Sequence, residues 1–299
     1  MTALLICTAL GMEARAVRRG LCRSPVHVRL RRTGLGPRRA ARVAAILPEF
    51  DALAVTGFAG SLVPGLRAGD VLVAEEIRYG DRVLACPSAP LLAGELARAG
   101  LRARTGSLLT VDHVVTGARG RELAERGAHA VDMETGPLAR AAAGRPVAAV
   151  RVVVDTPAAP LLSPATVRNA LTARRVLRRV GPALTRWAAA TAPRTVLRAS
   201  PDLDGAASRA DLVLVIGPTG SPEARHLVES ATRHAPARLV EAPEHIELAW
   251  LRGARTVVLT AGASTSPSLV DTAENALRGL GPVTTDESIT FTLPKDAQP

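Results

Sequence analysis

Short apolar runs alternate along this chain with stretches of helix-forming residues, and this alternation limits the possible folds more than any other feature. The runs are rich in Val, Leu and Ile, and Gly, Pro or charged residues end each of them. In the first half of the chain they lie at 4–9, 53–56, 70–74, 104–110 and 147–154. Helix-forming Ala, Leu, Arg and Glu dominate 38–47, 91–99 and 119–126. The pattern predicts an α/β domain with a mostly parallel or mixed sheet.

A second series of strand and helix signals follows an arginine-rich helix that we predict at 164–190. The segment 193–207 has a weak pattern and contains Pro193 and Pro201, which favours a linker. We therefore expect a first domain over 1–192, a linker over 193–207 and a smaller α/β domain over 208–299. The strands of this second domain are predicted at 211–216, 237–240 and 256–260, and its helices at 223–233 and 268–277.

The composition is that of a globular protein with a strong basic charge. Hydrophobic residues make up 47% of the 299 residues and aromatic residues only 2%, so Ala, Val and Leu must form the core. The net charge of +11 comes almost entirely from arginine. We interpret it first as a solvated basic face and second as attraction to anionic substrates or a membrane surface. The basic residues are not interleaved with aromatic ones, so nucleic-acid binding is not expected.

Cysteine usage and hydropathy predict a soluble, cytoplasmic protein. Cys7, Cys22 and Cys86 lie far apart and form no CxxC or Cys/His pair, which fits a reducing compartment better than a disulfide or a metal site. The apolar N-terminal run lacks a basic segment before it, and Glu13 and Arg15 follow it at once. We therefore expect a buried strand there instead of a signal peptide. No apolar run approaches the roughly 20 residues that cross a bilayer.

Three short segments place polar residues at predicted strand ends, where ligands bind in open α/β sheets. Gly11 and Arg15 follow the first strand, Glu134 follows a short predicted strand, and Asp155 ends a buried strand. A glycine lets the backbone approach a ligand, and an arginine can reach an anion. Taken one at a time, a segment of this kind is more often a cap, a turn or an ion pair, for example between Asp155 and Arg151.

The order of these segments resembles that of the nucleoside phosphorylase and methylthioadenosine/adenosylhomocysteine nucleosidase superfamily over residues 1–190. The resemblance implies a twisted central sheet flanked by helices, a purine nucleoside as substrate, inorganic phosphate as co-substrate and a homo-oligomer. We expect no cofactor and no metal. The matching segments are 11–13, 56–60, 66–76, 111–113 and 131–134, with the strand end at 151–155.

The resemblance assigns a role to each candidate residue by position. Met133 and Glu134 correspond to residues that hold the ribose, with Glu134 bonding the sugar hydroxyls. Asp155 corresponds to the acid that meets N7 of the purine and stabilises the departing base. Gly57 and Phe58 correspond to the substrate-binding loop. Cleavage of an N-glycosidic bond builds positive charge on the ribose and negative charge on the base, and groups of this kind stabilise both.

Arg15 departs from the nucleosidase pattern and narrows the expected reaction. The nucleosidases carry at this position a glutamate that activates the attacking water, whereas a guanidinium stays protonated at neutral pH. Gly11 and Arg15 have the spacing of the phosphate loop of the phosphorylases, so we expect phosphorolysis, with Glu13 as the alternative base for hydrolysis. Phe58 also departs, because many relatives have a small or hydroxylated residue there. His113 lies in a matching segment and is as readily structural.

Within the superfamily, the segments 11–15, 57–60, 111–113 and 131–134 are most similar to the hopanoid-associated phosphorylases. This resemblance implies a 5′-substituted adenosine with a bulky apolar group, namely adenosylhopane, as the substrate. It also implies peripheral proximity to a membrane.

In the second half of the chain, the segments 210–217, 221–228, 250–253, 260–264 and 291–294 carry a further resemblance. Through them, residues 208–296 resemble the C-terminal third of 4-hydroxy-3-methylbut-2-enyl diphosphate reductase, an iron–sulfur enzyme of isoprenoid synthesis. The resemblance implies that Ser221 and Ser264 bind a diphosphate-like group. However, the cluster needs three cysteine thiolates, and residues 191–299 contain no cysteine. Glu223 stands where the family has an asparagine, and its charge would repel an anion. We therefore expect this domain to hold no iron–sulfur cluster and to be non-catalytic. For the function of the whole protein, the alternatives to nucleoside cleavage are a reductase-related isoprenoid protein and a non-catalytic binding or scaffold protein.

Overall fold

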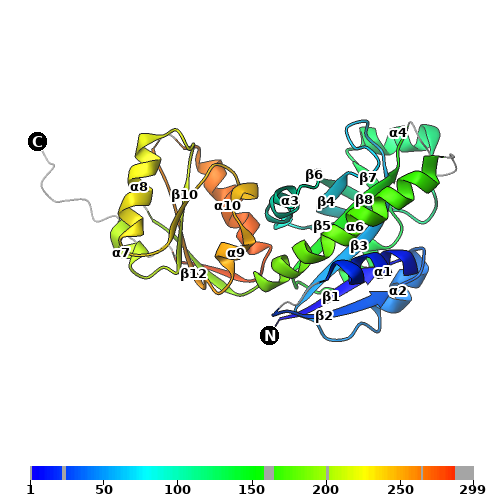
Figure 1. Cartoon of the computed structure of the whole chain (residues 1–299), viewed down its shortest axis with the longest axis horizontal. Helices are drawn as coiled ribbons and strands as arrows, with labels where there is room; N and C mark the ends of the chain where they lie inside the picture. The colour runs from blue at the N-terminus through cyan, green and yellow to red at the C-terminus, as the bar shows by residue number, and fades with distance from the viewer. Residues whose placement is uncertain (1, 22–24, 158–164, 200–201, 264, 287–299) are drawn as a thin grey trace, which may run out of the picture.

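The chain folds into two α/β units with a long helix, α6 (Ala165–Ala189), running from the first unit to the second (Figure 1). A computed structural model describes residues 2–21, 25–157, 165–199, 202–263 and 265–286. The first unit is a twisted sheet flanked by helices, and the second is a smaller sheet with helices on both faces. The predicted fold class is therefore confirmed.

The first unit contains an eight-stranded sheet whose order is β2-β1-β3-β7-β6-β4-β5, and β8 pairs with both β3 and β4. Because β3 also pairs with β7, part of the sheet closes on itself as the ring β3-β8-β4-β6-β7. The strands are β1 (Ala3–Thr8), β2 (His27–Arg32), β3 (Ala52–Ser61), β4 (Val71–Tyr79), β5 (Arg82–Ala85), β6 (Ala103–Thr110), β7 (Ala130–Asp132) and β8 (Val147–Asp155).

The five strands predicted by residue range in this unit are confirmed, and so is the strand expected before Glu134, which is β7; β2 and β5 were not predicted. β2 and β5 are the two ends of the strand order, and most of their side chains are exposed or half-buried. Edge strands of this kind carry few apolar residues and give a weak sequence signal. β7 has only three residues and ends directly before Met133 and Glu134.

Helices cover the first sheet on both faces. On one face α1 packs along α6, and the two backbones approach so closely that a side chain at Gly20 would collide with the carbonyl oxygen of Arg178. On the other face α2 and α5 enclose Leu5, Leu53 and Leu138. The helices of this unit that precede α6 are α1 (Gly11–Gly20), α2 (Pro37–Ala44), α3 (Ala89–Arg98), α4 (Gly117–Glu125) and α5 (Thr135–Arg140).

The second unit is a five-stranded parallel sheet with the order β11-β10-β12-β9-β13. Helices α9 and α10 lie on the face toward the first unit, and α7 and α8 lie on the opposite face (Figure 1). The strands are β9 (Arg194–Arg198), β10 (Leu212–Ile216), β11 (Ala237–Val240), β12 (Thr256–Ala261) and β13 (Val283–Asp286). The helices are α7 (Leu203–Ala207), α8 (Pro222–Thr232), the 3₁₀ turn η1 (Pro243–His245), α9 (Leu248–Leu251) and α10 (Pro267–Arg278).

The expectation of a linker over 193–207 was wrong. This segment contains β9, which pairs with β12 and β13 inside the second sheet, and it also contains α7. The strand was missed because Arg194, Thr195 and Arg198 leave only two apolar residues in five. Its two arginines are held by backbone carbonyls and by acidic side chains of the same unit, which only the folded chain brings close.

The two units share one continuous apolar core. It includes residues of β4, β8 and α3 in the first unit, the inner face of α6, and residues of β10, β12 and α10 in the second. At the junction, the indole N–H of Trp187 donates a hydrogen bond to Ser88 Oγ at 3.0 Å, and Arg98 donates to the carbonyl oxygen of Glu244 at 3.0 Å. Across the described ranges, no helix is both long and apolar enough to cross a membrane.

Candidate active site

A cavity of about 270 Å³ lies where β3, β7 and β8 end and α1 begins. Most of its wall is apolar, but carboxyl groups of Glu13, Glu134 and Asp155 reach it from three separate segments. The sheet brings these segments together because β3 pairs with both β7 and β8. The lining residues are Ala9, Leu10, Glu13, Leu35, Phe58, Ala59, Gly60, Val111, His113, Val114, Val115, Val131, Asp132, Met133, Glu134, Val154 and Asp155.

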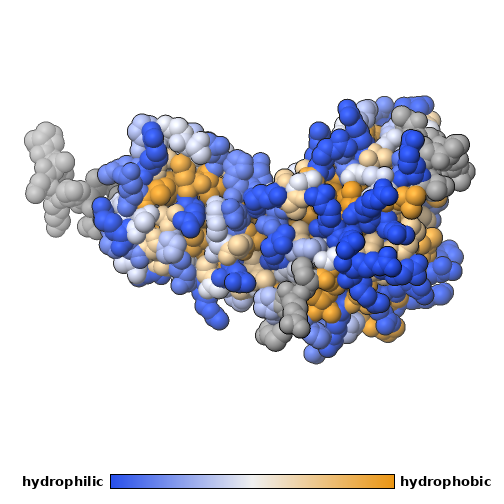
Figure 2. All heavy atoms as spheres, in the orientation of Figure 1, coloured by the Kyte–Doolittle hydropathy of each residue, from blue (hydrophilic) through white to orange (hydrophobic). Residues whose placement is uncertain are grey.

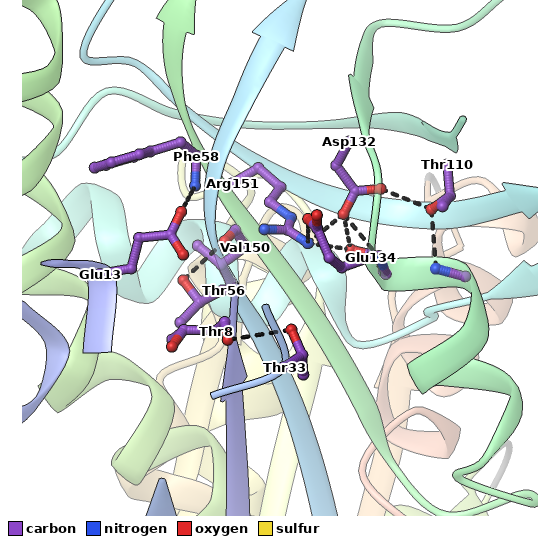
Figure 3. Close-up of polar contacts among 12 residues, drawn as sticks. Thr8, Glu13, Thr33, Thr56, Phe58, Thr110, Asp132, Glu134, Val150 and Arg151 are labelled. Atoms are coloured by element: carbon purple, nitrogen blue, oxygen red, sulfur yellow. Dashed lines mark hydrogen bonds and ion pairs between the residues drawn. The ribbon is translucent and has the colours of Figure 1, made fainter. Parts of the chain in front are cut away.

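Glu13 lies in the first turn of α1, and its side chain is directed to the end of β3 (Figure 3). Its Oε2 accepts a hydrogen bond from the backbone N–H of Leu10 at 2.7 Å, and its Oε1 accepts one from Phe58 at 2.8 Å. The residue is only 2% exposed. Burial raises the pKa of this carboxyl group above its ordinary value, and the nearby charge of Arg151 opposes that effect in part.

Arg151 carries a buried positive charge beneath the cavity. Its guanidinium pairs with the Asp132 carboxylate, and both side chains are only 1% exposed. The same Nη2 donates to Thr135 Oγ1 at 2.6 Å, and Thr110 Oγ1 donates to Asp132 Oδ1 at 2.6 Å. Glu134 Oε2 lies 4.0 Å from Arg151 Nη2 (Figure 3). The arginine therefore neutralises Asp132 and lowers the cost of burying further carboxylates nearby.

Glu134 lies between β7 and α5, directly before the first residue of α5, and its side chain lines the cavity. Its Oε1 accepts a hydrogen bond from the backbone N–H of Gly36 at 2.8 Å. Burial is the main cause that raises the pKa of this carboxyl group; Arg151 opposes it, and the charges of Asp132 and Glu13 add to it. The Glu134 side chain therefore interacts with the charged groups of the cavity wall and does not cap α5.

Asp155 is the last residue of β8, and its carboxyl group packs against the backbone of β3 at Gly60. A side chain at Gly60 would come within 2.7 Å of Asp155 Oδ2, so only glycine leaves room there. Burial raises the pKa of Asp155, and only its own backbone N–H opposes the shift. Among the described residues no cation pairs with it, and Arg151 is engaged with Asp132 instead. A half-buried acid of this kind is suited to hold a proton and donate it.

The structure brings most of the predicted site residues together. Phe58, Met133, Glu134, Asp155 and also His113 line the cavity. Gly57 lies just behind it, since a side chain there would come within 2.6 Å of Glu13 Oε1.

Gly11 and Arg15, the predicted phosphate ligands, are not among the residues that line the cavity. Arg15 is exposed on α1, and its Nη1 would lie 4.0 Å from a methyl group placed on Gly11. Nη1 of Arg32, at the end of β2, would lie 3.4 Å from the same methyl group. The two guanidinium groups therefore flank Gly11 outside the cavity.

Sequence reasoning missed several members of the site. Asp132 was overlooked although it directly precedes Met133, and Arg151 was considered only as a partner for Asp155. A charged residue inside an otherwise apolar strand, as Arg151 is in β8, is a signal that would have found it. Leu35 and Val114 were also missed, because exposed apolar residues in loops carry no periodic pattern.

The predicted diphosphate ligands of the second unit are described only in part. Ser221 caps α8, accepting a hydrogen bond from the backbone N–H of Ala224 at 3.2 Å. Glu223 Oε1 accepts a hydrogen bond from the backbone N–H of Ala263 at 2.8 Å. A carboxylate therefore already lies against the loop after β12, where an anion was expected to bind. Ser264 lies outside the described residues. In the parts of the chain that the structure describes, no group of three or more His, Cys, Asp or Glu side chains is placed to hold a metal ion.

Comparison with known families accounts for most of the chain. The profile of the phosphorylase superfamily matches residues 13–186, which include most of the cavity lining and most of the first sheet. The chain belongs to the phosphorylase superfamily. A second profile, that of the LytB protein, matches residues 194–278 and so begins with β9, inside the segment expected as a linker.

Solved structures of nucleosidases and of a hydrolase share the fold of the first unit. S-adenosylhomocysteine nucleosidase of Streptococcus pyogenes, in complex with 5-methylthiotubericidin, is 21% identical, with a TM-score of 0.51 over 62% of this chain and 94% of that one. Futalosine hydrolase of Helicobacter pylori is 15% identical, with a TM-score of 0.53 over 61% and 97%. The 5′-methylthioadenosine/S-adenosylhomocysteine nucleosidase of Neisseria meningitidis, in complex with methylthio-immucillin-A, is 19% identical, with a TM-score of 0.53 over 62% and 98%. At these identities the likeness establishes the fold.

The second unit is similar to part of a different enzyme. It is 42% identical over 95 residues to 4-hydroxy-3-methylbut-2-enyl diphosphate reductase 2 of Mycobacterium bovis, and 40% identical over 96 residues to the reductase of Bordetella pertussis. The matches cover 29% and 30% of this chain and the same shares of those proteins, so the chain spans under a third of the curated relatives that it matches. Residues 194–278 contain no cysteine and therefore offer no thiolate to an iron–sulfur cluster.

Proposed function

We propose that the cavity of the first unit cleaves the N-glycosidic bond of a purine nucleoside. The observation that carries this proposal is the convergence of Glu13, Glu134 and Asp155 on one largely apolar cavity in a chain of this superfamily. Glu134 accepts hydrogen bonds from the ribose hydroxyls. Asp155 donates its proton to the departing base, which its raised pKa favours, and so neutralises the charge that builds there.

The acceptor of the ribosyl group that we propose is water, activated by Glu13. The Glu13 side chain lines the cavity, and its raised pKa makes the carboxylate a stronger base than an ordinary glutamate. Water attacks C1′ and transfers a proton to Glu13, while the C1′–N bond breaks and the base leaves with the proton from Asp155. Arg15 suggested phosphorolysis from the sequence, and it does not line the cavity.

Phosphate is the second candidate acceptor, and one observation favours it. Arg15 and Arg32 flank Gly11 at the beginning of α1, beside Leu10 and Glu13 of the cavity wall. Two guanidinium groups at the beginning of a helix suit an oxyanion. Because Arg15 and Arg32 do not line the cavity, phosphorolysis requires a phosphate held between them to reach C1′ of a substrate inside the cavity.

An apolar 5′ substituent is the part of the substrate that the cavity rim favours. Leu35 and Val114 line the cavity and are nevertheless 53% and 55% exposed, so they present apolar surface at its mouth. Leu10, Val111 and Val115 continue this surface inward. We propose a 5′-substituted adenosine, and the hopane group of adenosylhopane is the bulky case that the sequence resemblance suggests.

The test is release of adenine from 5′-methylthioadenosine and from a 5′-alkyl analogue, with and without inorganic phosphate. We expect adenine to be released from both substrates at a rate that does not change when phosphate is added. Asp155→Asn should lower kcat about 10²- to 10⁴-fold. Asp81→Asn, which changes an exposed aspartate in the turn between β4 and β5, is the matched control. An unimpaired Asp155→Asn would overturn the site, and a phosphorylated sugar among the products would overturn water as the acceptor.

For the second unit we propose a structural role. Its helices α9 and α10 pack into the same apolar core as α6 and α3. The backbone N–H of Ala263, in the loop after β12, already donates a hydrogen bond to the Glu223 carboxylate. Anaerobically purified protein should show no absorbance of an iron–sulfur cluster, because the unit has no cysteine. Stoichiometric iron and acid-labile sulfide in that preparation would contradict this role.

A further inference from the structure

The outer face of α6 carries a one-sided charge that the proposed chemistry does not use. From Thr156 to Pro201 the sequence contains no Asp or Glu, and every charged residue is an arginine. Within α6, Arg174, Arg175 and Arg178 are exposed, and the described residues hold no carboxylate within ion-pairing distance of any of them. Like charges three and four residues apart destabilise a helix by a few tenths of a kcal/mol per pair. Helix stability therefore does not explain this arrangement.

A second element extends the same basic face. α1 packs along α6 and ends in Arg18 and Arg19, both exposed, near the middle of α6. Hydrophilic residues cover the surface over α1 and α6 in the view of Figure 2, on the near side of the first unit. Between α1, α6 and the end of α3 lies a hollow of about 550 Å³ lined by Arg19, Gly20, Ala99, Arg175, Arg178, Arg179, Pro182 and Arg186.

Acidic groups near this hollow are already engaged. Glu95 on α3 pairs with Arg186 and Arg98. Arg179 is held by the carbonyl oxygen of Ala99. The guanidinium groups of Arg19, Arg175 and Arg178 in this hollow have no carboxylate partner among the described residues. Their planar donors match the geometry of phosphate oxygens.

We propose that this arginine face, made of Arg18 and Arg19 of α1 and Arg174, Arg175 and Arg178 of α6, docks the protein on an anionic lipid surface. The face draws its five guanidinium groups from two helices that pack against each other, α1 and α6, so its charges fit a surface of many phosphates better than one small anion. Leu171, one turn before Arg174 and Arg175 on the exposed side of α6, is 48% exposed and places an apolar side chain beside the charges. Basic residues next to an exposed apolar one are typical of interfacial helices.

α6 is also joined to the cavity wall, because Val154 of β8 lines the cavity. Asn169, close to the beginning of α6, donates a hydrogen bond to the carbonyl oxygen of Val154, the neighbour of Asp155. The helix that carries the arginines is therefore attached to the strand end that carries the proposed acid.

The test is co-sedimentation of the full-length protein with vesicles of phosphatidylcholine alone and of phosphatidylcholine and phosphatidylglycerol in equal parts. We expect binding only to the anionic vesicles and loss of binding as salt is raised. The triple variant Arg174→Gln/Arg175→Gln/Arg178→Gln should partition about 100-fold less, since each basic residue near such a surface contributes roughly a factor of five. The triple lysine variant at the same positions should keep most of the binding.

A matched control removes the same charge elsewhere. Arg121→Gln/Arg225→Gln/Arg252→Gln changes three exposed arginines outside the face and should bind almost as well as the parent protein. Thermal melts establish that the variants fold. Equal binding to neutral vesicles, no binding to anionic ones, an equal loss in the control, or preference for a DNA duplex over the anionic vesicles would each overturn the proposal.

Discussion

Each unit of the molecule buries an arginine, and the surroundings of the two side chains differ. Arg151 in β8 and Arg194 in β9 are 1% and 3% exposed. Arg151 is neutralised by Asp132 and lies beside a second carboxylate of the cavity wall. Arg194 contacts no carboxylate in the described chain; it donates hydrogen bonds to the carbonyl oxygens of Ala190, Ala192 and Leu251.

The difference indicates what each buried charge does. Arg151 balances the charge of buried acidic side chains in the cavity wall, so its contribution is made at the site. Arg194 ties the chain just after α6 to the end of α9, so its value lies in the joint between the units. Burial without an acidic partner lowers the pKa of Arg194 to about 10, so this guanidinium still carries its charge at neutral pH.

The largest effect on stability is expected from Arg151→Met. The change leaves the Asp132 carboxylate buried without its cation, which should lower the free energy of unfolding by about 3–5 kcal/mol. Urea unfolding followed by circular dichroism measures the loss. The double variant Arg151→Met/Asp132→Asn should recover most of this stability and still cleave nucleosides poorly. Recovery of both stability and activity in the double variant would show that the pair only supports the fold.

Arg194→Met should cost less, about 1–3 kcal/mol, because it leaves main-chain carbonyls without donors but no charge without a partner. The same urea titration measures this effect. Nucleoside cleavage by the folded variant should equal that of the parent protein, since no side chain of the cavity contacts Arg194. A fall in kcat comparable with that of Arg151→Met would remove the distinction between the two arginines.

The buried acids predict a pH dependence that sharpens the comparison. Burial raises the pKa of Glu13, so the folded chain binds this proton more tightly than the unfolded chain. The resulting stabilisation is complete below the ordinary pKa of glutamate and is lost as the pH rises through the raised value. A difference of one in the pKa between the folded and the unfolded chain corresponds to about 1.4 kcal/mol in the free energy of unfolding.

The free energy of unfolding of the parent protein, minus that of Glu13→Gln, should therefore fall from acid to neutral pH. Urea unfolding at a series of pH values measures the difference. Glu223→Gln, which changes an exposed glutamate in the first turn of α8, is the reference variant. A difference that rises toward neutral pH would show that the nearby Arg151 outweighs burial at Glu13.

The smallest effect is expected from Glu223→Gln itself. Its carboxylate accepts one hydrogen bond, from Ala263 at the surface of the second unit. We expect a change of about 0.5–1.5 kcal/mol at most in the free energy of unfolding, and no change in nucleoside cleavage. Pyrophosphate binding that appears in the variant, measured by calorimetry, would show that the carboxylate blocks an otherwise competent anion site.

The sequence was informative wherever local patterning is strong. Long apolar strands such as β3 and β8 bury both faces, so runs of Val, Ala and Leu identified them, and polar residues at their ends marked Asp155. Strands at the edge of a sheet and strands with alternating arginine gave no such signal. This is why β2 and β9 were missed, and with β9 the true beginning of the second unit.

What the sequence by itself determined is the presence of two α/β units and the positions of Met133, Glu134 and Asp155 after strands, because both depend on short-range hydrophobic patterns. The tertiary structure decided which residue of the first loop faces the cavity. Glu13 and Arg15 lie in α1, not in an irregular loop, and two residues of a helix are separated by about 200° around its axis. The packing of α1 against the sheet therefore turns Glu13 inward and Arg15 outward. That rotation comes from burial of one helix face, and it changes the proposed acceptor from phosphate to water.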